Sequence, residues 1–307
     1  MSEQQSSNIL GSNNVLLPGG LTEIIWATFR IYVTNFKGFL IISAIVEIPL
    51  FVVGLIYSRV ALSRIKDELD LWMDASLGLI DMSPEIALNH LISACQENMI
   101  TLLGFGLIIG PILLIATSLR IGALIHAIAE QTIRKPISVN RAYGYAIKFR
   151  LKSLVIVSFV IFLLILLAAL PVFSLIGIPV VIYLAVRWNF IFQIIVLEGD
   201  NSLIQTNKRF IFSRSSILTS DSWWKTFIVL LAIFILGFAI NMLFQYTLGL
   251  IPIIGGVIIS TLLAPLFLIG QTLLYFESRS LASIKIIEGV ALKDFNIEVL
   301  RNELKIH

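Results

Sequence analysis

The chain has 307 residues, of which 58% are hydrophobic and 13% are charged, and its mean hydropathy is +0.95. Soluble domains are roughly 45–50% apolar and about 25% charged, so this composition excludes a soluble globular protein and indicates an integral membrane protein. The net charge of +3 comes from basic residues spread between apolar segments, not from one basic face, so we expect no nucleic-acid partner.

Residues 1–20, MSEQQSSNILGSNNVLLPGG, are rich in Ser, Asn, Gln and Gly. They lack the basic start, apolar middle and cleavage site of a secretory signal, and we predict a mobile polar tail. A membrane domain is predicted over residues 21–279, and residues 280–307 are predicted to form a cytoplasmic tail. Cys95 is the single cysteine, so no intrachain disulfide can form.

Six apolar segments are long enough for a bilayer core of about 30 Å, which needs about 20 helical residues. They are Phe39–Tyr57, Ile100–Leu119, Leu154–Phe173, Ile176–Leu197, Phe227–Leu248 and Val257–Tyr275. The predicted fold is therefore an all-α integral membrane protein with six transmembrane helices. The uncharged links after the third and fifth segments are short, which predicts two antiparallel hairpins.

Charge predicts the orientation of these spans. Residues 120–152 carry seven Lys or Arg against one Glu, and Lys208, Arg209 and Arg214 follow the fourth span. Residues 58–98 instead carry seven Asp or Glu against three basic residues. Because Lys and Arg collect on the cytoplasmic side, we predict a plasma-membrane protein with both termini cytoplasmic and an outer loop over 58–98. Ser83-Pro84-Glu85 predicts a helix start in this loop.

An amphipathic segment precedes the first, third and fifth spans, at residues 21–38, 138–152 and 202–215. In the first, apolar residues recur at helical spacing with charges elsewhere on the wheel, which favours a helix lying in the interface. The chain is thus predicted to contain three pseudo-repeats of interfacial helix plus helical hairpin. The alternative is that any multi-pass protein needs basic amphipathic linkers on its cytoplasmic side.

A family resemblance rests on LTEIIWATFRIYVTNFKGFL, IYLAVRWNFIFQIIVLEG, LIQTNKRFIFSRS followed by WWKTF, and LLYFESR. These strings resemble the glycerophosphoryl diester phosphodiesterase membrane domain, a multi-pass domain that some bacterial glycerophosphodiester phosphodiesterases carry and that also occurs alone. The most specific part comprises Tyr183, Arg187, Trp188, Glu198 and Gly199. The resemblance covers about Leu21 to Arg279 and includes no catalytic domain.

We expect no enzyme activity, no cofactor and no metal. The three histidines, His90, His126 and His307, are far apart in the chain, and none pairs with another at metal-ligand spacing. His126 and Glu130 at i, i+4 are interpreted as an ordinary interfacial pair. No glycine-rich phosphate loop followed by Lys occurs.

Glu47 and Arg187 are ionisable residues inside predicted spans. An arginine at the centre of a spanning helix costs roughly 2.5–3.5 kcal/mol on insertion scales, so it needs a partner or a route to the interface. At 1.5 Å per residue, Glu47 lies roughly 12 Å and Arg187 roughly 15 Å from the cytoplasmic span ends. We therefore predict that they face each other or a common polar cavity. Candidate neighbours are Asn189, Gln193, Asn241, Gln245 and Gln271.

Two interpretations of Arg187 stay open. A guanidinium in a cavity suits a phosphate or carboxylate, which it binds bidentately. Otherwise the residue forms a structural ion pair or reaches lipid phosphates at the interface.

These features give two leading functions. The first is a non-enzymatic membrane protein that handles or senses an anionic lipid-like or phosphate-bearing molecule near Arg187. The alternative is an anchoring or scaffolding module for a partner such as a soluble phosphodiesterase. Expected partners are membrane lipids and a protein at the cytoplasmic face or the outer loop. An intramembrane enzyme is the third class, and the sequence offers it neither a nucleophile with a base nor paired metal ligands.

Overall fold

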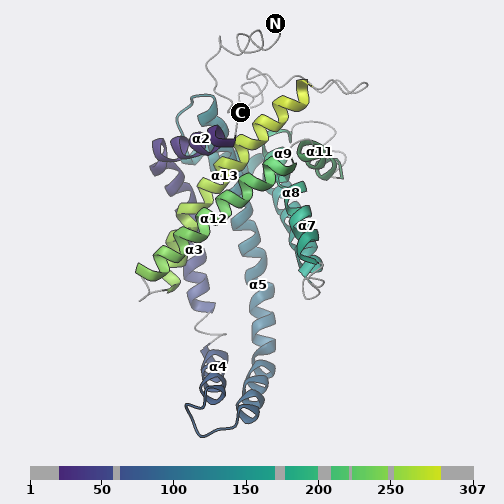
Figure 1. The fold of residues 1–307 in the computed structure, drawn as a ribbon. Coiled ribbons are helices and arrows are strands. Elements are labelled where there is room, and N and C mark those ends of the chain that lie inside the picture. The colour runs from purple at the N-terminus through teal and green to yellow at the C-terminus, as the bar shows by residue number, and fades with distance from the viewer. Residues whose placement is uncertain are drawn as a thin grey trace. The chain divides into compact units, whose positions relative to one another are not determined.

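The computed structural model describes residues 21–57, 63–169, 177–199, 209–220, 223–247 and 252–284. Every regular element in these ranges is a helix, which confirms the all-α prediction (Figure 1). Five helical segments in the described ranges are long and apolar enough to cross a membrane: Phe36–Ile56, Ile109–Thr132, Pro179–Leu197, Trp223–Ile240 and Ser260–Ser280. By helix length and composition the chain is a multi-pass membrane protein.

The described residues fall into two compact units. The smaller unit runs from Ile45 to Thr117, and the larger unit holds the described residues before Ile45 and after Thr117. The smaller unit contains α4 (Ser63–Ser76) and the first part of α5 (Pro84–Thr132). As predicted, a helix begins at Pro84, where the backbone N–H of Ile86 donates to Ser83 Oγ at 3.4 Å.

The second predicted span ends too early. Helix α5 continues past Leu119 without interruption to Thr132. As a result Arg120, His126 and Glu130, which were predicted to follow this span, lie within the candidate span Ile109–Thr132.

Helices of the larger unit come from all parts of the chain. They include α2 (Leu21–Thr34) and the start of α3 (Phe36–Tyr57), then α6 (Val139–Tyr145), the π-helical turn η2 (Ala146–Arg150) and α7 (Leu151–Ala169). They continue with α8 (Gly177–Arg187), α9 (Ile191–Leu197), α11 (Arg209–Ser220), α12 (Trp223–Thr247) and α13 (Pro252–Ile284). Helix α13 packs against both α2 and α12, and Figure 1 shows α12 and α13 running alongside each other.

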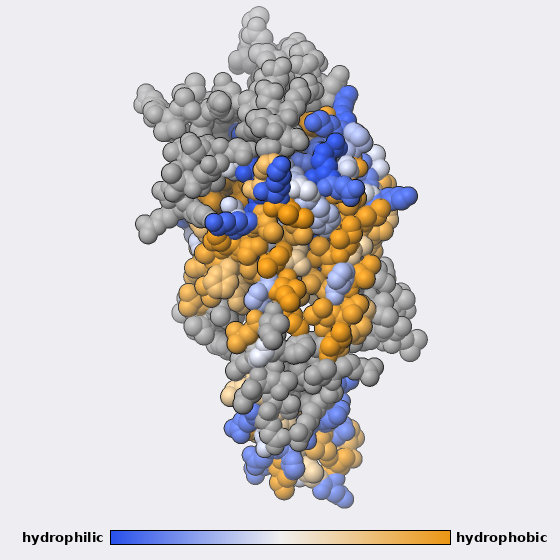
Figure 2. All heavy atoms as spheres, turned by 180° about the vertical axis from the view of Figure 1, so that it is seen from behind, coloured by the Kyte–Doolittle hydropathy of each residue, from blue (hydrophilic) through white to orange (hydrophobic). Residues whose placement is uncertain are grey.

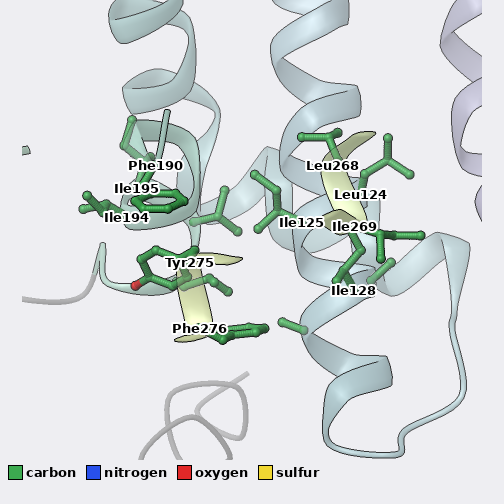
Figure 3. Packing of buried hydrophobic residues seen from close by; sticks show 14 of the residues in the cluster. Leu124, Ile125, Ile128, Phe190, Ile194, Ile195, Leu268, Ile269, Tyr275 and Phe276 are labelled. Atoms are coloured by element: carbon green, nitrogen blue, oxygen red, sulfur yellow. The ribbon is translucent and has the colours of Figure 1, made fainter. Parts of the chain in front are cut away.

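Helices α5, α9 and α13 supply most of the core of this unit (Figure 3). Leu124, Ile125 and Ile128 of α5 meet side chains from the α8–α9 region and from α13. Phe190 packs edge-on against Tyr275, with ring centroids 5.8 Å apart. The core therefore joins the spans by apolar contacts at their buried faces.

Large apolar side chains also cover the outer surface. Phe234 is 68% exposed and Phe159 is 51% exposed. In Figure 2, orange hydrophobic side chains form a broad area at mid-height, and blue hydrophilic side chains gather above it. An apolar area of this kind is expected where lipid replaces water as the solvent.

The fourth predicted span is not one continuous helix. Helix α8 ends at Arg187, residues 188–190 form a turn, and α9 begins at Ile191. The predicted span over Ile176–Leu197 is nevertheless confirmed as a candidate, because Pro179–Leu197 is long and apolar enough to cross a membrane.

The third predicted span corresponds to α7, which is not one of the five candidate spans. Its expected end at residues 170–173 lies outside the described residues, as do residues 174–176 of the first predicted hairpin link and residues 249–251 of the second. The rest of both links was predicted wrongly as turn, because Gly177 and Pro179 lie in α8 and residues 252–256 lie in α13. The amphipathic segments before the spans contain helices α2, α6 and α11, as predicted.

Candidate functional site

The break between α8 and α9 is held by side chains of α11. Ser215 Oγ donates to the carbonyl oxygen of Arg187 at 2.9 Å, and Thr219 Oγ1 donates to the same oxygen at 3.3 Å. The backbone N–H of Phe190 donates to Ser215 Oγ at 3.3 Å. Non-helical backbone at membrane depth is tolerated only where such groups find partners or line a cavity. Here α11 supplies the partners.

A cavity of about 440 Å³ lies beside this break. Its lining residues come from α5, α7, the α8–α9 region and α13: Arg120, Ile121, Ile161, Leu164, Val181, Leu184, Ala185, Trp188, Asn189, Phe192, Ala264, Phe267, Leu268 and Gln271. The turn places Trp188 and Asn189 in the cavity wall. Apolar walls with a few polar groups, at this volume, are typical of small-molecule and cofactor sites.

Three polar side chains give this cavity its chemistry. Gln271 Nε2 donates to Asn189 Oδ1 at 2.7 Å, which joins α13 to the helix break. Asn189 Nδ2 is buried and has no hydrogen-bond partner in the described part of the chain. Arg120, from α5, adds a guanidinium to the lining. We call Arg120, Asn189 and Gln271 the polar set of the cavity.

Arg120 also interacts electrostatically with Tyr143 of α6. Burial raises the pKa of the Tyr143 hydroxyl to about 12, and the positive charge of Arg120 opposes this rise. Tyr143 therefore stays protonated at neutral pH, and its hydroxyl donates to the carbonyl oxygen of Ile42 at 2.5 Å.

Arg187 is not among the lining residues of this cavity. Its Nε donates to Ser216 Oγ at 2.8 Å and its Nη1 donates to Tyr183 OH at 2.5 Å. The guanidinium also lies 5.6 Å from the centre of the Tyr183 ring. Arg187 thus contacts the same helix, α11, that supports the break.

The other predicted site residues differ in where they lie. Glu47 is half-buried in the part of α3 that belongs to the smaller unit, and its pairing with Arg187 stays a prediction. Gln193 is fully buried in α9, and neither its Oε1 nor its Nε2 has a hydrogen-bond partner in the described ranges. It does not line the cavity. The side chains of Asn241 and Gln245 lie outside the described residues.

Arg120 is the residue that sequence reasoning missed, because a span was predicted to end at Leu119. A usable signal existed. The residues that follow Arg120, IGALIHAIA, remain apolar for two further helical turns.

A second polar cluster surrounds Glu198, at the end of α9. Tyr275 OH donates to Glu198 Oε1 at 2.6 Å. Arg214 Nε lies 3.3 Å from Glu198 Oε2, and Arg279 Nε lies 3.4 Å from Oε1. All four side chains are buried. We call Glu198, Arg214, Tyr275 and Arg279 the Glu198 network; it ties α9, α11 and α13 together.

Gly199 leaves room for the Arg150 side chain next to the Glu198 network. A Cβ at Gly199 would lie 2.4 Å from the carbonyl oxygen of Ile195 and 2.7 Å from Arg150 Nη1. Arg150 Nε in turn donates to Tyr145 OH at 3.1 Å. The Glu-Gly pair at 198–199 therefore has a packing reason for each residue.

His126 and Glu130 form part of another buried cluster. Arg141 Nε lies 2.5 Å from Glu130 Oε1, whereas His126 Nδ1 is 4.0 Å from Glu130 Oε2. The His126 ring stacks on Tyr145, with centroids 4.3 Å apart. Glu130 thus pairs more closely with Arg141 than with its predicted partner. In the described ranges, no three His, Cys, Asp or Glu residues group in a way that could hold a metal ion.

No family model matches the chain, and neither a curated protein nor a solved structure shows significant similarity to it. The resemblance to the phosphodiesterase membrane domain therefore stays a prediction.

Proposed function

We propose that this protein is a non-enzymatic plasma-membrane protein that handles or senses an anionic, lipid-like or phosphate-bearing molecule in the cavity beside the α8–α9 break. The observation that carries the proposal is the polar set, one arginine and two amides in an otherwise apolar cavity of about 440 Å³. Arg offers a planar fork of donors to phosphate or carboxylate, and the amide N–H groups donate to the remaining oxygens.

The cavity belongs to a class of site that recurs in membrane proteins. Broken helices at membrane depth place backbone and polar side chains around a ligand. Here the turn at 188–190 brings Asn189 to the wall, and its bond to Gln271 fixes the amide in place. This location replaces the immediate surroundings of Arg187 as the favoured binding position, because Arg187 contacts Tyr183 and Ser216 instead.

The proposal is tested by native mass spectrometry with lipid analysis on gently solubilised protein. The unmodified chain is compared with Arg120→Gln, which removes the charge, and with Ala185→Phe, which places a ring in the cavity. Ala239→Phe is the matched control, because Ala239 is exposed on α12 and lines none of the described cavities. We expect a defined anionic species that the unmodified chain and the control retain and that both cavity variants lose.

Two other outcomes would overturn the assignment. Loss of the species in Arg187→Gln, with retention in Arg120→Gln and Ala185→Phe, would move the site to Arg187. Absence of any retained species from the unmodified protein would favour an anchoring module for a partner protein.

The finer architecture, six spans in three pseudo-repeats, is part of this proposal. Each amphipathic helix donates one or more side-chain hydrogen bonds to a carbonyl oxygen of a neighbouring repeat. Tyr32 OH of α2 donates to Leu262 O of α13 at 2.9 Å, Tyr143 of α6 donates to Ile42 O of α3, and Ser215 of α11 donates to Arg187 O of α8. The order of these contacts is cyclic. The helix of the second repeat bonds to the first repeat, that of the third bonds to the second, and that of the first bonds to the third. Such an arrangement supports a pseudo-threefold bundle with α7 as the sixth span.

The proposed orientation can be tested with the native cysteine. Cys95 is exposed on α5, in the predicted outer loop. A membrane-impermeant maleimide should label it in intact cells. Lys148→Cys in a Cys95→Ser background should be labelled only in inside-out vesicles. The reverse pattern would invert the topology.

A further inference from the structure

A second, apolar cavity lies between α12 and α13. Its volume is about 400 Å³, and it is lined by Ile233, Phe234, Gly237, Phe238, Ser260, Leu263, Ala264, Leu266 and Phe267. Among the described residues no charged side chain lines it, and both flanking helices belong to candidate spans. We call it the α12–α13 groove. Phe234 and Phe238, on its rim, are 68% and 55% exposed, so the groove lies at the apolar outer surface.

The groove adjoins the polar cavity through shared side chains. Ala264 and Phe267 line both cavities. The two cavities therefore adjoin at these two residues of α13.

From Leu263 to Gln271, the lining residues of α13 change from apolar to polar. Ser260 and Leu263 line only the groove, Ala264 and Phe267 line both cavities, and Gln271 lines only the polar cavity. The Glu198 network begins one further turn along, at Tyr275. From Leu263 to Gln271 the rise is about 12 Å. An apolar stretch followed by hydrogen-bonding groups, in this order, matches the order of chain and head group in a lipid.

From this we infer that the ligand is an anionic acyl lipid, whose head group binds the polar set and whose chain lies in the α12–α13 groove. This inference rests on the proposed function and narrows its ligand class. Because lipid tails are as apolar as the groove, chain burial adds little affinity. The head group supplies the attraction, and the groove determines where the chain goes.

The test uses the full-length protein in phosphatidylcholine nanodiscs that contain a phosphatidic acid with a diazirine near the end of one acyl chain. After irradiation, cross-linked residues are located by mass spectrometry. We expect labelling to concentrate on residues 233–238 and 260–267, and unlabelled phosphatidic acid to compete with it. Inorganic phosphate and glycerol phosphate serve as head groups without a chain.

A pair of variants separates the groove from general lipid contact. At Gly237 a Cβ would meet Leu263 Cδ1 at an ordinary 3.5 Å, so Gly237→Leu should fold and fill the groove. Ala239→Leu adds similar bulk at an exposed site on the same helix. We expect Gly237→Leu to reduce labelling of the groove at least tenfold, and Ala239→Leu to leave it unchanged. Arg120→Gln should also abolish the competed labelling.

The outcomes distinguish this inference from the function on which it rests. If anionic species still depend on Arg120 and Ala185 but labelling spreads evenly over exposed faces of other spans, the chain does not occupy the groove and the inference fails alone. If inorganic phosphate or glycerol phosphate binds as tightly as the lipid, the ligand is a free phosphate compound and the inference is wrong. If labelling is insensitive to Arg120→Gln and to competitor, the contact is that of bulk lipid, and both proposals lose their support.

Discussion

The Glu198 network and the polar set of the cavity are two ways of placing polar groups inside one membrane-embedded unit. Around Glu198, the carboxylate is bonded by Tyr275 and paired with two arginines. In the cavity, Asn189 and Gln271 share one hydrogen bond, and Asn189 Nδ2 has no partner among the described residues. A satisfied buried network makes a structure rigid, whereas a buried donor without a partner costs free energy that a ligand accepting from it would recover.

The predicted family resemblance rests partly on residues of the Glu198 network. Two of its most specific residues, Glu198 and Gly199, lie at the network, where each has a packing role. Arg187 contacts α11 and Tyr183. Residues that stand out in the sequence can therefore mark the fold, while the site is lined by less conspicuous ones.

The largest loss of stability is expected for a substitution at Glu198, the centre of the Glu198 network. Glu198→Gln removes the charge that compensates Arg214 and Arg279, and breaking a buried pair from one side costs about 3–5 kcal/mol. We expect the variant to lose most of its monodisperse, folded fraction after mild heating in detergent. The matched control is Glu85→Gln, which neutralises an exposed carboxylate on α5 and should keep its folded fraction. Equal heat resistance of the two variants would show that the network is not structural.

A smaller loss of stability is expected for Gly199→Ala. Alanine there would bring a methyl group against a backbone oxygen and the Arg150 guanidinium, and overpacking of this kind costs about 1–3 kcal/mol. Gly144→Ala in α6 is the opposite case. A Cβ there has no neighbour within 4 Å, and replacing a helical glycine gains up to about 1 kcal/mol. Apparent melting temperatures should shift in opposite directions; a shift in the same direction would contradict the packing argument.

Tyr143→Phe tests the bond between α6 and α3. Loss of the hydrogen bond to Ile42 O should cost about 1 kcal/mol at neutral pH. Burial raises the pKa of this hydroxyl to about 12, above its ordinary value of about 10. The protonated hydroxyl therefore stabilises the fold fully below pH 10, and this stabilisation is lost as pH rises from about 10 to about 12.

The melting-temperature difference between the unmodified protein and Tyr143→Phe should accordingly shrink over that pH interval. Tyr32→Phe provides a comparison, because Tyr32 donates a similar bond to Leu262 O and burial also raises its pKa. If the melting-temperature difference for Tyr143→Phe stays constant up to pH 12, the ionisation of this hydroxyl is not coupled to unfolding.

Hydropathy was sufficient to predict the helical class and most spans, because burial in lipid demands long apolar helices whatever the packing. It could not predict the break in the fourth span. Residues 188–190 are Trp, Asn and Phe, without Gly or Pro, and the hydrogen bonds that support the turn come from Ser215 and Thr219 on another helix. Partners so distant in sequence leave no local signal.

The candidate site was predicted in part. Asn189 and Gln271 were named as neighbours of a polar cavity, since amides within spans are uncommon enough to stand out. Their bond to each other depends on how α13 packs and could not be predicted. Arg120 was missed because a charge was taken to end a span, although α5 carries it within one.

The smallest effect on stability, and the sharpest contrast with Glu198, is expected from the double substitution Asn189→Leu with Gln271→Leu. Replacing both partners of a hydrogen bond by apolar groups is close to neutral, and side-chain bonds between membrane helices average only about 0.6 kcal/mol. Heat resistance should therefore stay near that of the unmodified protein, while retention of the anionic species in native mass spectrometry falls at least tenfold. The single change Asn189→Leu should destabilise more than the double change, because it leaves the Gln271 amide buried without its partner. If the double variant instead unfolds as readily as Glu198→Gln, the two amides hold the helices together. Their role is then structural, and the proposed ligand site loses its support.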